Sequence, residues 1–234
     1  MRALPLARLV DRALDAAFPG RCAGCGRDGR PICDACLPAL DARLDQPPGV
    51  PIGLPADLPA PLLQLEWAAA YGGTVRRALH ELKYAGERRL AVPLGGAIAR
   101  RWARVGAGGD VLVPVPVHAN RLRQRGYDQA WLLATVAADL LGLPLAPVLE
   151  RSRSTIAQFD LDRRARAGNV AGAFGLRRPP ASTAGLGRAH PLAGRWVVLV
   201  DDVVTTGATL AACAQPLLSA GAMGVSAVAM ARER

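Results

Sequence analysis

Two adjacent carboxylates, Asp201 and Asp202, are the residues of this sequence with the clearest capacity for chemistry. They end an apolar, β-branched run that begins at Trp196. Neighbouring carboxylates repel a phosphate, but they can accept hydrogen bonds from two adjacent hydroxyl groups of a ribose. They can also stabilise positive charge that develops on a sugar carbon. The acid pair therefore predicts the sugar end of a binding site, with Asp201 and Asp202 as catalytic residues.

The turn after the acid pair predicts a cradle for a phosphate group. It consists of Val203, Val204, Thr205, Thr206, Gly207, Ala208 and Thr209. A helical pattern follows, and the N-terminus of a helix offers unpaired N–H groups and partial positive charge. Threonine hydroxyls add donors, and a glycine lets the backbone approach a ligand closely. Acids and turn together predict a site for ribose 5-phosphate. The alternative is the ordinary start of a helix in an α/β unit.

A cluster of cations follows a second predicted strand, 111–117. This strand carries two prolines, which is typical of an edge strand or of a strand end. In one parallel sheet, the residues after both strands lie at the same edge, where α/β proteins bind ligands. We interpret five residues as a loop for pyrophosphate: Val117, His118, Arg121, Arg125 and Lys83. An exposed arginine cluster is the alternative.

Lys83 stands out because every other cation of the chain is an arginine. An ammonium is a compact point charge, whereas a guanidinium is a planar fork. A single lysine therefore indicates a chemical need for a point charge at this position. A surface position without such a role is the alternative.

The cysteines predict a structural zinc site. Four of the five form two Cys-x-x-Cys pairs separated by seven residues: Cys22 and Cys25, then Cys33 and Cys36. Each pair can aim two thiolates at one point, and two pairs supply the four sulfurs of a tetrahedral Zn²⁺ site. An iron–sulfur cluster or redox dithiols are the alternatives.

The remaining pattern predicts an α/β fold in which a parallel sheet is flanked by helices. The run before the acids is apolar without alternation, which is typical of a strand buried on both faces. Further strands are expected at 66–71, 111–117, 145–149, 170–176 and 224–230, and helices at 74–83, 89–104, 129–141 and 210–220. Three units are expected: an N-terminal helix with the cysteine module (1–40), a proline-rich linker (41–64) and the main domain (65–234). The polar segment 151–169 is typical of a lid, a binding loop or disorder.

The composition is that of a folded, basic protein. The chain has 234 residues, of which 51% are hydrophobic, and its formal net charge is +10. This charge suits phosphorylated ligands or nucleic acid, although an arginine-rich proteome would give the same balance. Charged residues interrupt the apolar N-terminal stretch, and no apolar run has transmembrane length. We therefore expect no secretory signal, no membrane insertion and a cytoplasmic location.

Five motifs resemble those of the ComF family and occur in the family's order. They are the two Cys-x-x-Cys pairs, the segments 71–76 and 83–86, the strand 113–116 with Arg121 and 125–127, the spaced Thr155, Gln158, Leu161 and Asn169, and the turn 199–209. That turn is similar to the phosphoribosyl pyrophosphate (PRPP) loop of type I phosphoribosyltransferases. One departure is Asp128, where the family usually has asparagine, so the role of this residue is open.

The resemblance implies a zinc ribbon joined to a type I phosphoribosyltransferase-like domain that binds PRPP or a nucleotide-like molecule with Mg²⁺. It also implies a role in natural competence, the uptake and use of DNA. Thr205 stands where purine-salvage members of the fold commonly carry an Asp base, which disfavours a hypoxanthine–guanine type activity. Three functions stay open: a transferase with an unidentified acceptor, a non-catalytic PRPP or nucleotide sensor, and a single-stranded-DNA handling module that works with competence proteins. A homodimer is a further open option.

Overall fold

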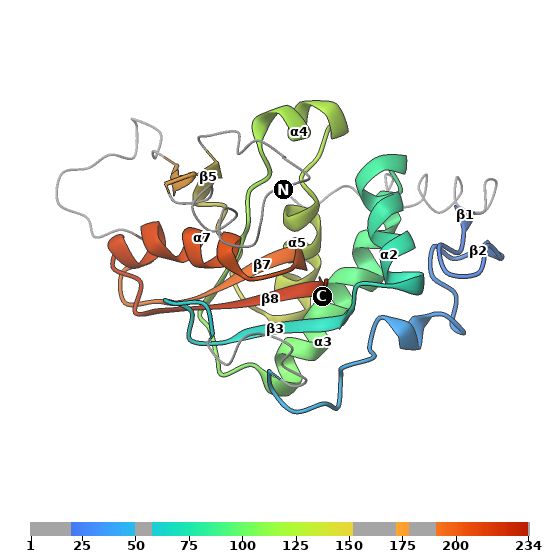
Figure 1. Ribbon diagram of the computed structural model, residues 1–234, viewed down its shortest axis with the longest axis horizontal. Helices are drawn as coiled ribbons and strands as arrows, with labels where there is room; N and C mark the ends of the chain where they lie inside the picture. The colour runs from blue at the N-terminus through green and yellow to red at the C-terminus, as the bar shows by residue number, and fades with distance from the viewer. Residues whose placement is uncertain (1–19, 50–57, 152–171, 178–190, 234) are drawn as a thin grey trace.

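A four-stranded parallel sheet forms the centre of the protein. The structure is a computed structural model that describes residues 20–49, 58–151, 172–177 and 191–233. The strand order is β3 (Leu65–Ala70), β8 (Gly224–Arg232), β7 (Trp196–Val204) and β4 (Val111–Pro114), and all neighbours are parallel (Figure 1). Together with the flanking helices and the N-terminal cysteine module, this sheet confirms the predicted α/β architecture, a parallel sheet covered by helices with a small cysteine module. β7, which carries the acid pair, lies between β8 and β4.

Helices cover both faces of the sheet. α3 (Ala91–Val105) and α5 (Gln129–Leu141) pack on each other and against one face, where Val198 of β7 lies. α7 (Ala208–Ser219) covers the opposite face, where Leu199 lies. Successive residues of a strand point to opposite faces, so a strand covered on both sides must be apolar throughout. The unbroken apolar run before the acids follows from this burial, and the three predicted helices agree with the structure to within two residues.

The helix expected at 74–83 differs from its prediction at its C-terminal end. α2 (Gly73–His80) continues into a π-helical turn, η2 (Glu81–Ala85), and a short 3-10 turn, η3 (Arg88–Leu90), follows. Gly86 ends η2 with a φ of 75°, in the left-handed region that favours glycine. Gly86 predicted the end of the helix. No feature of the sequence pattern indicated that its last turn would be π-helical. Single π turns of this kind are frequent at functional sites.

The cation cluster forms a helix that the sequence did not predict. α4 (Ala119–Arg125) follows the end of β4, with His118 as its N-cap and Gly126 in the left-handed region after it. The Nδ1 atom of His118 accepts a hydrogen bond from the N–H of Asn120 at 3.1 Å. The helix buries none of its residues, so it shows no apolar period from which to predict it.

A small antiparallel pair only partly matches two expected strands. β5 (Leu149–Arg151) pairs with β6 (Phe174–Leu176), whereas strands were expected at 145–149 and 170–176. β6 lies within one of the expected strands, and β5 begins at the last residue of the other. Leu145 instead forms a single parallel bridge to Leu112 of β4. β4 and β3 lie at the two edges of the main sheet, as the prolines of β4 and the short span of β3 indicated.

The cysteine module packs directly on the main sheet and its helices. It contains β1 (Gly20–Arg21), β2 (Asp28–Gly29) and the 3-10 turn η1 (Leu37–Ala39). The guanidinium of Arg77 on α2 donates to the carbonyl groups of Ala23 at 2.9 Å and Gly24 at 2.6 Å. The N–H of Arg43 donates to the carbonyl of Ala68 at 3.1 Å, so this part of the expected linker lies against β3.

Several expected features lie outside the described residues. They are the N-terminal helix, the middle of the linker (50–57), nearly all of the polar segment 151–169 and most of the insert before β7. Within the described part of the chain, every helix is too short or too polar to cross a bilayer.

Candidate functional site

The acid pair lies at the carboxyl end of β7, in the middle of the sheet. Both side chains are partly buried, and the N–H of Asp202 donates to Oδ1 of Asp201 at 2.7 Å. Burial and the neighbouring Asp202 carboxylate raise the pKa of Asp201 well above its usual range. An acid in this position needs a cation or a hydroxyl donor nearby.

Lys83 supplies a cation to this pair. Its Nζ lies 2.6 Å from Oδ2 of Asp202, and the two side chains are 19% and 14% exposed. Burial opposes the charged form of Lys83, but the carboxylates of Asp202 and Asp201 outweigh it and raise the pKa of the lysine. The η2 turn thus places the chain's one ammonium against the acid pair.

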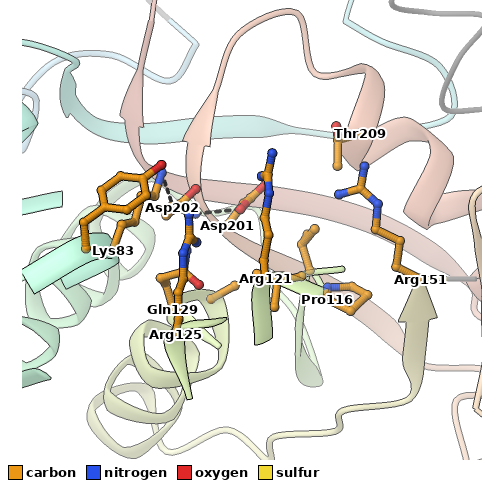
Figure 2. Close-up of a pocket in the computed structure, with 13 residues that line it drawn as sticks. Lys83, Pro116, Arg121, Arg125, Gln129, Arg151, Asp201, Asp202 and Thr209 are labelled. Carbon is orange, nitrogen blue, oxygen red and sulfur yellow. Dashed lines mark hydrogen bonds and ion pairs between the residues drawn. The ribbon is translucent and has the colours of Figure 1, made fainter. Parts of the chain in front are cut away.

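A polar cavity of about 200 Å³ opens beside the acid pair (Figure 2). It brings together side chains from η2, the segment after β4, α4, α5, β5, β7 and α7. Its lining comprises Lys83, Tyr84, Val115, Pro116, Val117, Arg121, Arg125, Gln129, Ala130, Arg151, Asp201, Asp202 and Thr209. Two carboxylates therefore share one cavity with four cations, an arrangement that suits a ligand carrying both hydroxyl and phosphate groups.

The structure brings four of the five residues of the predicted pyrophosphate loop to the cavity. Arg121 and Arg125 reach it from α4, Val117 from the segment between β4 and α4, and Lys83 from η2. His118 does not line the cavity, because its ring turns back to cap α4. Its place in the cation cluster predicted a binding role, and the contact that the structure shows is that of an N-cap.

The predicted phosphate cradle is only partly at the cavity. Thr209, on the first turn of α7, lines it, whereas Thr205 is exposed beyond it. Within the described part of the chain, the N–H groups of Thr205 and Thr206 have no hydrogen-bond acceptor. The N–H of Ala208 makes a long contact of 3.4 Å to Oγ1 of Thr206. Backbone donors therefore remain available at the start of α7.

Gly207 has a packing role in addition to the close approach to a ligand that the sequence predicts. Its φ is 80°, and a Cβ atom there would lie 2.7 Å from Cγ of Pro59 and 3.3 Å from Cδ2 of Leu65. The glycine therefore allows a left-handed turn and the packing of Pro59 against the backbone.

Asp128 ties the pyrophosphate loop to α5. Its two carboxylate oxygens accept the N–H groups of Val117 and Trp131, each at 3.1 Å. Burial raises the pKa of Asp128 in spite of these hydrogen bonds, and the carboxylate of Asp202 adds to the effect. The structure thus gives Asp128 a structural role: it caps α5 and positions Val117 in the segment between β4 and α4.

Sequence reasoning gave no role at the site to Tyr84, Gln129 or Arg151. Tyr84 was interpreted as part of a helix end, Gln129 as the start of α5 and Arg151 as part of a polar segment. Arg151 lines the cavity from β5, and its guanidinium carbon lies 5.3 Å from the ring centroid of Phe174. The polar segment in the sequence does not indicate this position. The one sign of a binding role in the sequence was the place of Gln129 at the start of a helix, after a strand and a polar segment.

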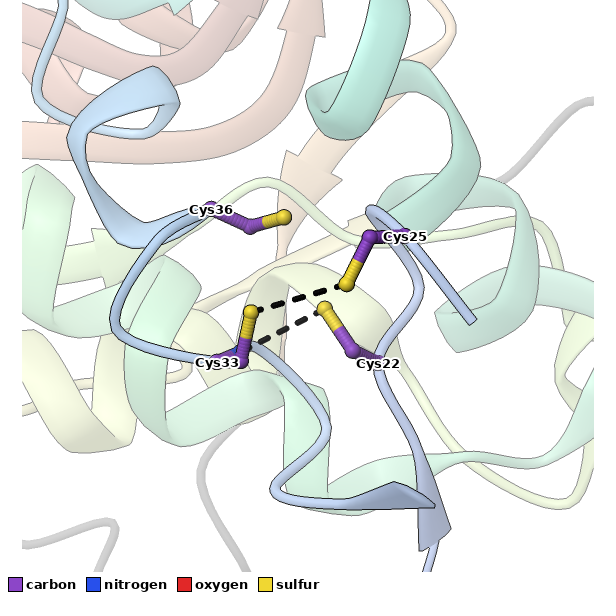
Figure 3. A group of neighbouring side chains, drawn as sticks. All are labelled: Cys22, Cys25, Cys33 and Cys36. Atoms are coloured by element: carbon purple, nitrogen blue, oxygen red, sulfur yellow. Dashed lines mark hydrogen bonds between the residues drawn. The ribbon is translucent and has the colours of Figure 1, made fainter. Parts of the chain in front are cut away.

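The four predicted zinc ligands converge on one point (Figure 3). The Sγ atoms of Cys22, Cys25, Cys33 and Cys36 all lie within 4.8 Å of one another, and those of Cys25 and Cys33 are 3.6 Å apart. With zinc–sulfur bonds of about 2.3 Å, a tetrahedral site places its sulfurs about 3.8 Å apart. The donor set therefore fits a structural Zn²⁺ ion.

Backbone donors favour thiolates in this module. The N–H groups of Gly24 and Cys33 lie 3.4 Å and 3.3 Å from Sγ of Cys22. Burial opposes ionisation of Cys22, but the backbone donors outweigh it and lower its pKa to about 6. Burial and the neighbouring thiols raise the pKa of Cys36 to about 12. Four thiolates cannot coexist here without a cation that cancels their repulsion.

The acid pair also offers the oxygen ligands that Mg²⁺ prefers. In this structure the Lys83 ammonium takes one of those oxygens, Oδ2 of Asp202. Asp201 keeps a carboxylate whose charge burial disfavours, so a cation bound together with a phosphorylated ligand fits the site.

The fold and the site define an α/β protein in which a polar cavity at the carboxyl edge of a parallel sheet is joined to a four-cysteine module. The chain belongs to the ComF family, to which its motifs pointed. It is 31% identical over 224 residues to DNA utilization protein YhgH of Escherichia coli (strain K12), and the match covers 91% of this chain and 90% of that protein. YhgH of Salmonella typhimurium is 31% identical over 223 residues, with the same coverage.

Competence protein F of Haemophilus influenzae is 33% identical over 124 residues, which are 53% of this chain and 50% of that protein. No family model matches the chain. Among solved structures, the glutamine PRPP amidotransferase from B. subtilis complexed with ADP and GMP is 22% identical, with a TM-score of 0.36 over 58% of this chain and 25% of that one. An allosteric regulatory enzyme of purine biosynthesis is 19% identical, with a TM-score of 0.38 over 60% and 26%.

Proposed function

We propose that this protein binds PRPP or a related ribose 5-phosphate ligand together with Mg²⁺, and that it acts in DNA uptake or utilisation. The observation that carries the proposal is the shared cavity of Asp201, Asp202, Arg121, Arg125 and Thr209. Carboxylates for sugar hydroxyls and cations for phosphates line the same cavity. The names of the relatives, DNA utilization protein and competence protein, support the cellular role.

In this proposal, each part of the cavity binds a different part of the ligand. Asp201 and Asp202 accept hydrogen bonds from the ribose hydroxyls, and Thr209 with the N–H groups that start α7 holds the 5′-phosphate. Arg121 and Arg125 bind the pyrophosphate. Mg²⁺, when bound with PRPP, would neutralise part of the negative charge of the pyrophosphate.

In a transfer reaction, the bond between C1 of the ribose and the pyrophosphate oxygen breaks, and its electron pair leaves with the pyrophosphate. An acceptor then forms a new bond to C1. The positive charge that develops on the ribose is stabilised by Asp201 and Asp202. The arginines stabilise the negative charge on the departing group.

Calorimetric titration with PRPP and Mg²⁺ tests the binding. We expect Asp202→Asn to weaken binding about tenfold or more, because a hydrogen bond to a charged group is lost. Asp139→Asn is the matched control, since Asp139 is an exposed residue of α5 outside the cavity. Equal affinities of the two variants for PRPP would contradict the proposed site.

Release of pyrophosphate in the presence of candidate acceptors separates a transferase from a sensor. Turnover with any acceptor, lost in Asp202→Asn and kept in Asp139→Asn, supports the transferase. Binding without turnover across a broad panel of bases supports the non-catalytic sensor.

Direct handling of single-stranded DNA is the second candidate function. The exposed arginines of α4 and the net charge of +10 favour it, as do the names of the relatives. It predicts an affinity for oligonucleotides that falls with rising salt, because bound phosphates release their counterions. An affinity that does not change with salt would argue against this function.

A further inference from the structure

Tyr84 is an aromatic side chain at the cavity rather than in the core. It is 66% exposed, although it lines the same cavity as the acid pair. It belongs to the η2 turn and directly follows Lys83. Only 4% of the residues of this chain are aromatic, and most of them are at least partly buried. An exposed ring beside a ligand cavity leaves a flat apolar surface available to a ligand.

Two neighbouring groups fix the ring. The guanidinium carbon of Arg125 lies 4.8 Å from its centroid, and the ring of His80 lies 4.8 Å away, tilted by 46°. Arg125 comes from α4 and His80 from the end of α2, so the ring is held between two elements. Aromatic rings and guanidinium planes are the surfaces on which unpaired nucleobases stack.

Gln129 provides a second, independent observation at the same cavity. Its side chain is 2% exposed, and its Oε1 has no hydrogen-bond donor among the described residues. Gln129 and Arg125 both line the cavity from its α4 and α5 side (Figure 2). Buried polar atoms are nearly always paired, so this acceptor fits a donor brought by a ligand. The ring N–H and amino groups of nucleobases are such donors, whereas phosphates are not.

We infer that Tyr84 and Gln129 form a subsite for a nucleobase beside the ribose phosphate. Tyr84 stacks on the base, and Gln129 accepts a hydrogen bond from its edge. The inference rests on the proposed function and deepens it, since it names the chemical class of molecule that reaches the site. The base belongs either to a mononucleotide or to a single-stranded oligonucleotide, because both present an unpaired base.

The test compares ligands that share the sugar phosphate and differ in the base. Affinities for PRPP, ribose 5-phosphate, AMP and a short oligodeoxythymidylate are measured by calorimetry. The variants are Tyr84→Leu, Tyr84→Phe and Gln129→Leu. Trp131→Leu is the matched control, because Trp131 is an aromatic residue of α5 that is 38% exposed and lies outside the cavity.

We expect the wild-type protein to bind AMP more tightly than ribose 5-phosphate. Tyr84→Leu should weaken the binding of AMP about tenfold, the usual scale for one stacked base, and leave the affinity for ribose 5-phosphate within about twofold. Tyr84→Phe should keep the affinity, Gln129→Leu should lower it for AMP alone, and Trp131→Leu should change neither ligand. Tyr84 dependence for AMP alone identifies a mononucleotide as the source of the base, and dependence for the oligonucleotide identifies a strand.

Two results would overturn the inference. One is equal affinity of the wild-type protein for AMP and ribose 5-phosphate, and the other is an equal loss of both in Tyr84→Leu. In either case binding of PRPP still supports the proposed function. If the wild-type protein binds neither PRPP nor ribose 5-phosphate, the proposed function fails, and the inference fails with it.

Discussion

The Nζ of Lys83 lies 2.6 Å from Oδ2 of Asp202, which joins the π-helical turn η2 to the carboxyl end of the central strand β7. The contact connects two segments that are far apart in the sequence. It also places a positive charge where two neighbouring carboxylates would otherwise repel each other. The ion pair is therefore both a feature of the site and a contribution to stability.

Lys83→Met should lower the free energy of unfolding by about 1–3 kcal/mol. Removing one partner of an ion pair leaves the other charge without compensation, and the loss is smaller than for a fully buried pair because both side chains keep some contact with solvent. Urea unfolding at neutral pH measures the change. Lys83→Arg keeps the charge and should lose less, and an unchanged midpoint in Lys83→Met would contradict the stabilising role.

Asp201→Asn should make the folded protein more stable at neutral pH while weakening the binding of PRPP. The pKa of Asp201 is raised by burial and by Asp202. A carboxyl group whose pKa is raised on folding contributes stability at low pH, where it is protonated in both states, and that contribution is lost as pH rises through the folded pKa. An uncharged amide avoids the loss.

The measurement is urea unfolding of Asp201→Asn and wild type from pH 5 to pH 8. We expect the variant to change less over this range, whereas Asp139→Asn, an exposed control, should follow the wild type. Parallel pH profiles for all three proteins would show that Asp201 does not carry this dependence.

Much of the fold follows from the sequence because its signals are local. The apolar run of β7 requires burial on both faces, and the helix α5 was predicted at 129–141, its observed bounds. The spacing of the four cysteines predicts that their sulfurs converge, since a Cys-x-x-Cys turn can aim two sulfurs at one point. The acids and the lysine were identified by residue type.

The cavity itself could not be predicted in the same way, because it depends on packing between distant segments. Tyr84 carries no local signal of a binding role, and Gln129 carries only that of its place at a helix start after a strand. The meeting of η2 with α5 brings the two residues to one cavity. The π turn η2 arises in a stretch whose sequence is compatible with an ordinary helix. His118 was assigned to the pyrophosphate loop from its place in the cation cluster, and the cap that it provides for α4 depends on a helix that the sequence did not predict.

Gly24→Ala should weaken zinc binding by the cysteine module. A Cβ atom at this position would lie 2.5 Å from Sγ of Cys36 and 2.8 Å from its Cβ, so the methyl group displaces a ligand. Such crowding costs about 1–3 kcal/mol, a factor of roughly 5 to 150 in affinity. Competition with a chromophoric chelator measures the affinity.

Gly175→Ala is the matched control for this experiment. Gly175 lies in β6, and a Cβ atom there has no neighbour within 4 Å. We expect its zinc affinity to equal that of the wild type. If Gly24→Ala also binds zinc with wild-type affinity, the four sulfurs adjust more freely than their packing indicates.

Asp128→Ala should destabilise the protein and weaken the binding of pyrophosphate-containing ligands. The substitution removes the cap of α5 and the acceptor for the N–H of Val117. Loss of an N-cap alone costs about 0.5–2 kcal/mol, and release of Val117 frees the segment that leads into α4. Because Arg121 and Arg125 lie on α4, the looser segment should reduce the affinity for PRPP more than that for ribose 5-phosphate, which lacks the pyrophosphate. Urea unfolding gives the stability and calorimetry the two affinities. An equal loss for both ligands would mean that Asp128 supports the whole cavity rather than its cationic side.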